Sequence, residues 1–281
     1  SYSKTRFSMT YSECIAWLYS QLPMYQNVGK KAVKKDLTNT YLLCKGLENP
    51  HKKTTFIHVA GTNGKGSVSH ILSSIYQAAG FKTGLYTSPH YLDFRERIRV
   101  DGQMISEENV VGFVEEHKEL ILDVSPSFFE ITVAMAFDHF ARQEVDLAII
   151  ETGLGGRLDS TNVIHPMLSV ITRIGLDHMD MLGPDLASIA TEKAGIIKRN
   201  IPVLIGVKQS ETMEVFSQVA QKQHAKVHYA DYLNTLQGEQ PSIVFESGHS
   251  LDYIQGRFYF YGKEYAYMSD LIGIYQRENI R

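Results

Sequence analysis

Residues 61–67 (GTNGKGS) combine three glycines, a lysine and two hydroxyl side chains directly after the apolar run 55–60. A loop that leaves a buried strand and enters a helix presents unpaired backbone N–H groups at the positive end of the helix dipole, which favours an anion. The glycines let the backbone approach phosphate oxygens, while Lys65 supplies a positive charge and Ser67 a hydroxyl. We predict a polyphosphate-binding loop made of Gly61, Thr62, Asn63, Gly64, Lys65, Gly66 and Ser67.

The loop departs from the Walker A pattern Gly-x-x-x-x-Gly-Lys-Ser/Thr at two positions. The pattern has a glycine where this chain has Val59, and here Gly66 separates Lys65 from Ser67. A glycine-rich turn without a ligand is therefore an alternative interpretation. The strand-like run before the loop and the helix-like run 67–80 after it favour the ligand-binding interpretation.

Three further polar residues, Ser88, Glu151 and His178, come directly or shortly after apolar, strand-like runs. Open α/β sheets bind ligands at the carboxyl ends of their strands. Mg²⁺ prefers hard oxygen ligands and accepts a histidine less often. Together these residues predict a metal site that faces the phosphate loop. Taken singly, Glu151 could cap a helix and His178 could be a hydrogen-bonded loop histidine. The surrounding stretch 87–102 is expected to be a long polar loop, whose three arginines could form a solvated face: Arg95, Arg97 and Arg99.

The order of the remaining segments predicts an α/β fold. A capping box at Thr10–Glu13 begins one helix, and further helices are expected at 37–47, 106–122, 127–142 and 184–195. The intervening runs are almost wholly apolar, which is typical of strands buried on both faces. We predict a mainly parallel, doubly wound sheet of the P-loop NTPase type flanked by helices. A small antiparallel β section is expected near the C-terminus, at about 242–268.

Composition excludes several classes of protein. Of the 281 residues, 43% are apolar and 21% charged, which indicates a globular chain rather than a disordered one. The net charge of −3 gives no support to nucleic-acid or membrane binding. No apolar stretch approaches the length of a membrane span. Cys14 and Cys44 form no CxxC pair, so we expect free thiols and a cytoplasmic protein.

Five motifs together carry a resemblance to a known family: 61–67 (GTNGKGS), 87–98 (TSPHYLDFRERI), 151–163 (ETGLGGRLDSTNV), 176–183 (LDHMDMLG) and 190–198 (ATEKAGIIK). In this order and spacing they resemble folylpolyglutamate synthase and its relative dihydrofolate synthase, of the Mur ligase superfamily. The TSPH loop followed by RERI favours the folate branch over the peptidoglycan ligases. The resemblance covers nearly the whole chain.

The resemblance implies ATP-dependent amide formation. A folate carboxylate attacks the γ-phosphate of ATP, and the amine of L-glutamate captures the resulting acyl phosphate. The implied cofactors are ATP and Mg²⁺, with two metal ions expected. The implied substrates are ATP, L-glutamate and a folate, with dihydropteroate as a possible second acceptor. A monomer without nucleic-acid or membrane partners is expected.

Roles for individual residues also follow from the resemblance. Ser88, Glu151 and His178 resemble the metal ligands of the family, and Lys65 and His178 are assigned to catalysis. Lys193, in the EKAGI stretch, matches a lysine that the family carbamylates. Phe128, Phe129 and Asp159 correspond to positions near the pterin side of the site, while core packing is an alternative interpretation of the two aromatic residues at a helix start. The stretch 273–279 (GIYQREN) has Tyr275 where the family has a histidine, and it would bring Asn279 to the nucleotide.

Family enzymes continue into a smaller, Rossmann-like second domain that closes over the nucleotide. We therefore expect residues 1–281 to be the ATP-binding domain alone, with weak nucleotide binding and little or no ligation by itself. Two alternatives stay open. One is another P-loop phosphoryl-transfer enzyme, and the other is a non-catalytic, truncated paralogue that binds nucleotide or folate.

Overall fold

The computed structural model describes residues 8–21, 36–230, 254–260 and 263–269. The strands of its central sheet are β1 (Thr55–Ala60), β2 (Thr83–Tyr86), β3 (Ile98–Val100), β4 (Gln103–Met104), β5 (Leu147–Glu151), β6 (Leu168–Ile171), β7 (Val203–Ile205) and β8 (Val227–Tyr229). Their order is β4-β3-β2-β5-β1-β6-β7-β8. The neighbouring strands in the part β2-β5-β1-β6-β7-β8 of this order are parallel. At the other edge, β3 and β4 are antiparallel to their neighbours. The mainly parallel sheet predicted from the sequence is confirmed.

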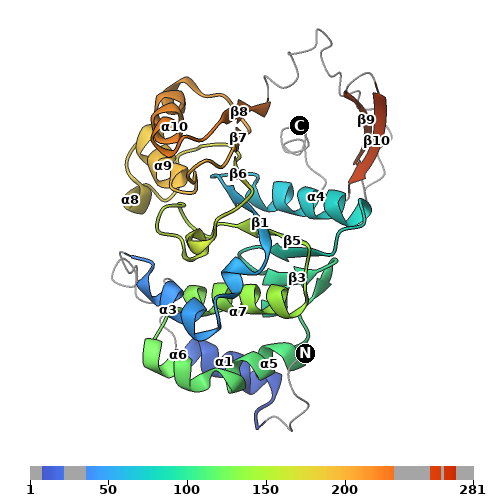
Figure 1. Ribbon diagram of the computed structural model, residues 1–281, viewed down its shortest axis with the longest axis vertical. Helices are drawn as coiled ribbons and strands as arrows, with labels where there is room; N and C mark the ends of the chain where they lie inside the picture. Colours follow the sequence, from blue (N-terminus) through green and yellow to red (C-terminus); the bar gives the residue numbers. More distant parts are fainter. Residues whose placement is uncertain (1–7, 22–35, 231–253, 261–262, 270–281) are drawn as a thin grey trace.

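Helices cover both faces of this sheet: α1 (Tyr11–Gln21), α3 (Thr38–Gly46), α4 (Lys65–Ala78), α5 (Glu107–Glu116), α6 (Lys118–Val124), α7 (Phe128–Arg142), α8 (Met179–Leu182), α9 (Leu186–Ala194) and α10 (Ser210–Gln223). Short 3₁₀ turns lie at η2 (Pro50–Lys52), η3 (Phe94–Arg97) and η4 (Ser160–Val163). Figure 1 shows α4 on one side of the sheet and α7 on the other, with α1, α5 and α6 in a further layer beyond α3 and α7. The doubly wound arrangement is thus confirmed.

The alternation of side chains in β1 explains the layers. Ile57 and Val59 point into a core shared with residues of α4, whereas Phe56 joins the core built with α7 and Ala60 the core beneath α9 and α10. Successive side chains of a strand face opposite sides of a sheet. Ile57 and Val59 therefore share one apolar cluster on one face, while Phe56 and Ala60 belong to two clusters on the other face. The phosphate loop leaves the end of this strand, which fixes it at the centre of the sheet.

The predicted polar loop at 87–102 is wrong in its second half. Asp93 caps η3 through a capping box with Glu96, and β3 then returns antiparallel to β2. Ile98 is fully buried and pairs with Tyr86, so an apolar residue among the charges forms a strand by packing into the core.

The helix predicted over 106–122 is two helices, because the chain leaves helical geometry at His117. This residue ends α5 and precedes α6 with φ −112° and ψ 16°. Its ring packs edge-on against Phe113 at 5.0 Å between ring centroids. The capping box predicted at Thr10–Glu13 is confirmed by hydrogen bonds in both directions at the start of α1.

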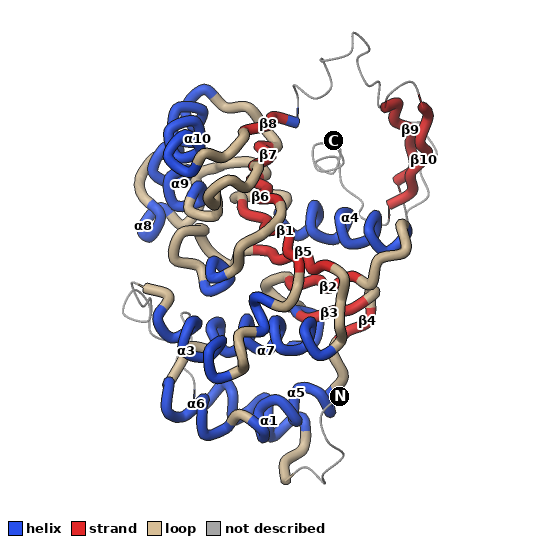
Figure 2. The backbone as a smooth tube through the Cα atoms, viewed as in Figure 1, coloured by secondary structure: helices blue, strands red, loops and turns tan. Residues whose placement is uncertain are grey.

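Near the C-terminus, β9 (Ile254–Phe260) and β10 (Lys263–Ser269) form an antiparallel pair (Figure 2). They fall within the section for which the sequence predicts antiparallel strands, while residues 242–253 lie outside the described residues. Among the helices that the structure describes, none combines the length and apolarity needed to cross a membrane.

Candidate active site

The predicted phosphate loop connects β1 to α4. Gly61 has a φ of 153°, and a Cβ at this position would lie 1.8 Å from Oγ1 of Thr172. Gly64 adopts the left-handed conformation, with φ 86°, as the N-cap of α4, and no side chain caps the helix. The N–H groups of the first helical turn therefore lack a side-chain acceptor, as an anion-binding helix terminus requires.

Hydrogen bonds to the segment after β6 hold this loop in place. The amide of Thr62 donates to the carbonyl of Arg173 at 2.7 Å, and its hydroxyl bonds both backbone groups of Gly175 at 3.0 and 3.1 Å. The hydroxyl of Thr172 donates to the carbonyl of Asn63 at 2.7 Å. Backbone and hydroxyl groups of the segment after β6 therefore fix the conformation of the loop.

Two lysines donate to carbonyls of the loop. Lys65 Nζ lies 3.2 Å from the carbonyl oxygen of Thr62, and Lys193 Nζ lies 2.9 Å from that of Gly61. Lys193 comes from the last turn of α9 and is only 4% exposed. Burial lowers its pKa to about 8, and the charge of Lys65 contributes further. The amine of Lys193 is therefore partly neutral near pH 8.

Glu151, at the end of β5, faces the same loop from the adjacent strand. Its side chain is buried, and Oε2 accepts a hydrogen bond from the amide of Ser88 at 3.1 Å. A Cβ on Gly66 would lie 3.8 Å from both carboxylate oxygens, so the carboxylate sits against the first turn of α4. Burial raises the pKa of Glu151 to about 7, although Lys65 opposes this. A cation bound here would offset the cost of burying the charge.

His178 differs from this buried group in its exposure. It is the N-cap of α8 in the left-handed conformation, its side chain is 55% exposed, and Nε2 lies 3.6 Å from Oδ2 of Asp177. Within the described ranges, no three His, Cys, Asp or Glu side chains are grouped as a metal site would need. A Mg²⁺ ion beside the phosphate loop would be coordinated by Glu151, hydroxyl oxygens, water and phosphate oxygens. Mg²⁺ accepts such a set of oxygen ligands.

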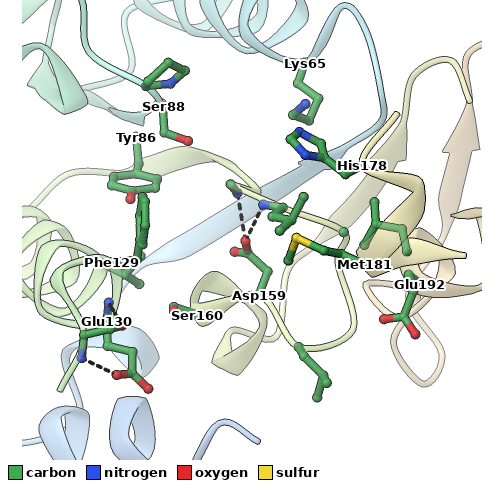
Figure 3. A pocket seen from close by; sticks show the side chains of 18 of the residues that line it. Lys65, Tyr86, Ser88, Phe129, Glu130, Asp159, Ser160, His178, Met181 and Glu192 are labelled. Carbon is green, nitrogen blue, oxygen red and sulfur yellow. Dashed lines mark hydrogen bonds between the residues drawn. The ribbon is translucent and has the colours of Figure 1, made fainter. Parts of the chain in front are cut away.

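A cavity of about 490 Å³ extends from these groups towards α7. Figure 3 shows Lys65, Ser88 and His178 at one end of it and Phe129 and Glu130 at the other. Six of the residues that line the cavity come from the segment after β5: Gly153, Leu154, Gly155, Leu158, Asp159 and Ser160. Glu151 and Lys193 do not line the cavity, and Lys65 is its one lining residue from the loop 61–67. The predicted site residues that line it are Lys65, Ser88, Phe129, Asp159 and His178.

The two aromatic residues predicted on the pterin side have different surroundings. Phe129 lines the cavity. Phe128 is only 2% exposed, stacks on Tyr19 at 4.9 Å between ring centroids and is not among the lining residues. The assignment of Phe128 to the site is therefore corrected to a core position, because consecutive helical residues point in different directions. Asn279 lies outside the described residues.

Sequence reasoning missed Arg97 as a cavity residue. It is 5% exposed, its guanidinium lies 5.5 Å from the ring centroid of Phe128 and 5.8 Å from that of Phe129, and Nε donates to Nδ1 of His90 at 2.7 Å. Arg95, two positions earlier, instead pairs with Asp93 near the surface. The solvated face considered for the arginines is thus wrong for Arg97. Arg97 differs from Arg95 in that it directly precedes β3, and the sequence did not reveal this strand.

The segment after β5 also packs on the end of α9. The amide of Arg157 donates to the carbonyl of Glu192 at 2.7 Å, and its guanidinium pairs with the carboxylate of Glu192 at 2.8 Å. Gly195 makes this approach possible, because a Cβ there would lie 2.3 Å from Cα of Arg157. This contact fixes the neighbouring Lys193 against the phosphate loop.

We therefore expect Gly195→Ala to lower the free energy of unfolding by about 3 kcal/mol, because the clash involves backbone atoms that cannot rotate away. The matched control is Gly80→Ala, whose added Cβ meets nothing within 4 Å. Its φ of 89° should cost only about 1 kcal/mol. Urea denaturation of both variants checks the difference, and equal losses would contradict the packing argument.

The sheet, the central glycine loop and the surrounding charged groups define a phosphate-loop α/β protein. The chain belongs to the Mur ligase family, because residues 59–281 match the Mur ligase middle domain. This finding agrees with the resemblance stated on the five sequence motifs.

Individual relatives are more specific. The chain is 39% identical over 279 residues to a dihydrofolate synthase/folylpolyglutamate synthase of Bacillus subtilis, covering 96% of this chain and 61% of that protein. It resembles a solved FPGS–AMPPCP–folate complex with a TM-score of 0.85 at 31% identity, covering 97% of this chain and 65% of the other. The folylpolyglutamate synthase of Thermotoga maritima gives 0.78 at 34% identity, with 96% and 59% covered. The chain thus spans less than two thirds of the length of each of these relatives.

Proposed function

We propose that this chain is the ATP-binding part of a ligase that joins L-glutamate to the carboxylate of a folate, with dihydropteroate as a possible second acceptor. The observation that carries the proposal is one cavity that is lined by Lys65 of the phosphate loop, by Ser88 and, on its aromatic wall, by Phe129. Such a cavity suits a substrate whose aromatic body and reacting carboxylate lie at opposite ends. The likeness to folylpolyglutamate synthases and to an FPGS–AMPPCP–folate complex supports it.

The chemistry has two steps. An oxygen of the acceptor carboxylate attacks the γ-phosphorus of ATP, the bond to the β-phosphate oxygen breaks, and ADP leaves. The amine nitrogen of glutamate then attacks the acyl carbon, phosphate leaves, and the amine loses a proton as the amide forms. Both reactants of the first step are anions, so positive groups must offset their repulsion. The first-turn amides of α4 and the ammonium group of Lys65 are suited to this task.

Residues 61–67 would hold the phosphates of the nucleotide, which Asn279 would approach. Ser88 and Glu151, with His178, would hold Mg²⁺, of which we propose two ions. Bound Mg²⁺ supplies positive charge next to the transferring phosphate. The burial of Glu151 beside the phosphate loop suits this role, because a cation there compensates its charge. Phe129 and Asp159 would contact the acceptor.

Lys193 would act as a carbamate. Its buried amine, with a pKa lowered to about 8, has the neutral form that attacks CO₂. The nitrogen then forms a bond to carbon and releases a proton, which converts a positive group into a negative one. A negative side chain next to Gly61 can position a metal ion, whereas an ammonium group would repel it.

The test is Mg·ATP-dependent incorporation of labelled glutamate, with tetrahydrofolate and dihydropteroate as parallel acceptors. It is run on this chain and on a longer polypeptide that continues past Arg281, because we propose that the family's second domain completes the site. We expect product from the longer polypeptide and little or none from this chain. Robust incorporation by this chain alone would contradict the need for a second domain.

Two alternatives give different results in the same assay. Another phosphoryl-transfer enzyme would leave phosphate on its product, whereas a ligase releases one inorganic phosphate for each amide formed. A non-catalytic binding protein would bind ATP or folate without turnover. Absence of product from both polypeptides, despite measurable ATP binding, would contradict the ligase proposal.

A further inference from the structure

A buried histidine lies in the middle of the central strand. His58 of β1 is fully buried, while its neighbours on the same face, Phe56 and Ala60, are apolar. A buried polar side chain in such a position is costly unless it forms hydrogen bonds. Its Nε2 lies 2.8 Å from Oγ1 of Thr161 in η4, and Nδ1 has no partner. Among the described residues, Thr161 is therefore the hydrogen-bond partner of this ring.

Thr161 connects the histidine to the cavity wall. Its hydroxyl donates to Oδ1 of Asp159 at 2.5 Å, and its amide donates to the same oxygen at 3.0 Å. The other oxygen, Oδ2, accepts from the amides of Gly153 and Leu154 at 2.8 and 2.9 Å. Figure 3 shows these two bonds to Asp159 beside the cavity. One carboxylate thus links both ends of the segment that forms this wall.

The direction of each hydrogen bond follows from the groups involved. The hydroxyl of Thr161 has one hydrogen, which goes to the carboxylate of Asp159. Nε2 of His58 must therefore donate to Oγ1, so the ring carries its hydrogen on Nε2. Burial lowers the pKa of His58 to about 3, with the charge of Lys198 as a smaller cause, and the ring stays neutral. Its N–H occupies one side of the hydroxyl oxygen and keeps the hydroxyl hydrogen directed at Asp159.

We propose that His58 is a positioning residue: through Thr161 it holds the carboxylate of Asp159 and so fixes the cavity wall 153–160 against which the acceptor binds. This inference rests on the proposed function, since the acceptor is the pterin-bearing carboxylic acid of that reaction. His58 and Thr161 are buried and do not line the cavity, so they act through Asp159 and not by touching substrate.

Four substitutions separate positioning from simple core packing. Thr161→Val keeps the shape and removes the hydroxyl, while Thr161→Ser keeps the hydroxyl. His58→Leu removes the donor, while His58→Gln places an amide N–H near the position of Nε2. We expect Thr161→Val and His58→Leu to weaken acceptor binding about tenfold. Thr161→Ser and His58→Gln should stay within about twofold of the unmodified protein, and binding of an ATP analogue should not change in any of the four.

Calorimetry measures both affinities on the longer polypeptide, with tetrahydrofolate as the acceptor. Hydrogen exchange of the Gly153 and Leu154 amides gives a second readout that needs no ligand, and it should be faster in Thr161→Val than in Thr161→Ser. Unchanged exchange and affinity in Thr161→Val would overturn the inference. Equal loss of acceptor and nucleotide binding would do so too, because it indicates a general structural role. An unmodified protein that exchanges slowly but binds no acceptor would instead contradict the proposed function, and with it the acceptor role of this wall.

Discussion

Glu151→Gln is expected to abolish the thermal stabilisation that Mg·ATP gives to the protein while leaving the ligand-free protein as stable or more stable at pH 8. Glutamine keeps the shape of the side chain but cannot supply the charge that a divalent ion requires. At 100 times its dissociation constant, a ligand raises the melting temperature of a protein of this size by about 5–10 °C. The variant should lose that increase, and ligation by the longer polypeptide should fall at least about 100-fold.

The ligand-free half of this prediction follows from linkage. Burial raises the pKa of Glu151 from 4.5 to about 7, so between these pH values the folded protein holds a proton that the unfolded chain releases. Stability contributed by Glu151 is therefore lost as the pH rises from about 4.5 to about 7. Glutamine carries no charge, so the melting temperature of the variant relative to the unmodified protein should rise between pH 5 and pH 8.

Thermal scans at both pH values, with and without Mg·ATP, check both halves. Glu214→Gln, an exposed position in the middle of α10, is the matched control and should behave as the unmodified protein. Retention of the Mg·ATP effect in Glu151→Gln would show that this carboxylate is not a metal ligand. A marked loss of ligand-free stability at pH 8 would show that its hydrogen bond to Ser88 outweighs the cost of burial.

Local sequence patterns were sufficient to predict the parallel sheet and the position of the phosphate loop. The central parallel strands are mostly apolar runs, and the loop lies where one run ends and a helical pattern begins, so neighbouring residues carry the signal. The juxtaposition of Ser88 and Glu151 also followed, because parallel strands end at the same edge. Here the hydrogen bond between the Ser88 amide and the Glu151 carboxylate agrees with that expectation.

Features that depend on long-range packing could not be predicted in this way. Arg95 and Arg97 look equivalent in the sequence, yet only the second is buried against the rings of α7. Phe128 and Phe129 are adjacent and chemically identical, and the rotation of α7 alone decides which one reaches the cavity. His58 reads as an interruption of an apolar strand until the fold brings Thr161 beside it, 103 positions later.

The last prediction concerns the proposed carbamate at Lys193. With ¹³C-labelled bicarbonate, the unmodified protein should give one carbamate signal by NMR that strengthens as the pH rises from 7 to 8.5. The physical reason is the pKa of about 8, below which the amine is protonated and cannot attack CO₂. Removal of CO₂ should lower ligation by the longer polypeptide, and added bicarbonate should restore it. Lys193→Ala should lack the signal and lose at least about 100-fold in ligation.

The chain itself offers a matched control. Burial also lowers the pKa of Lys198 to about 8, but its amine donates to the carbonyl of Asn162 at 2.9 Å, whereas that of Lys193 donates to the carbonyl of Gly61 in the phosphate loop. A depressed pKa alone would therefore make both lysines reactive, whereas carbamate formation that needs the phosphate loop and a neighbouring metal ion selects Lys193. The signal should disappear in Lys193→Ala and persist in Lys198→Ala. A signal that persists in Lys193→Ala and disappears in Lys198→Ala would mean that the amine next to Gly61 stays unmodified. Lys193 would then act, if at all, as a positive charge.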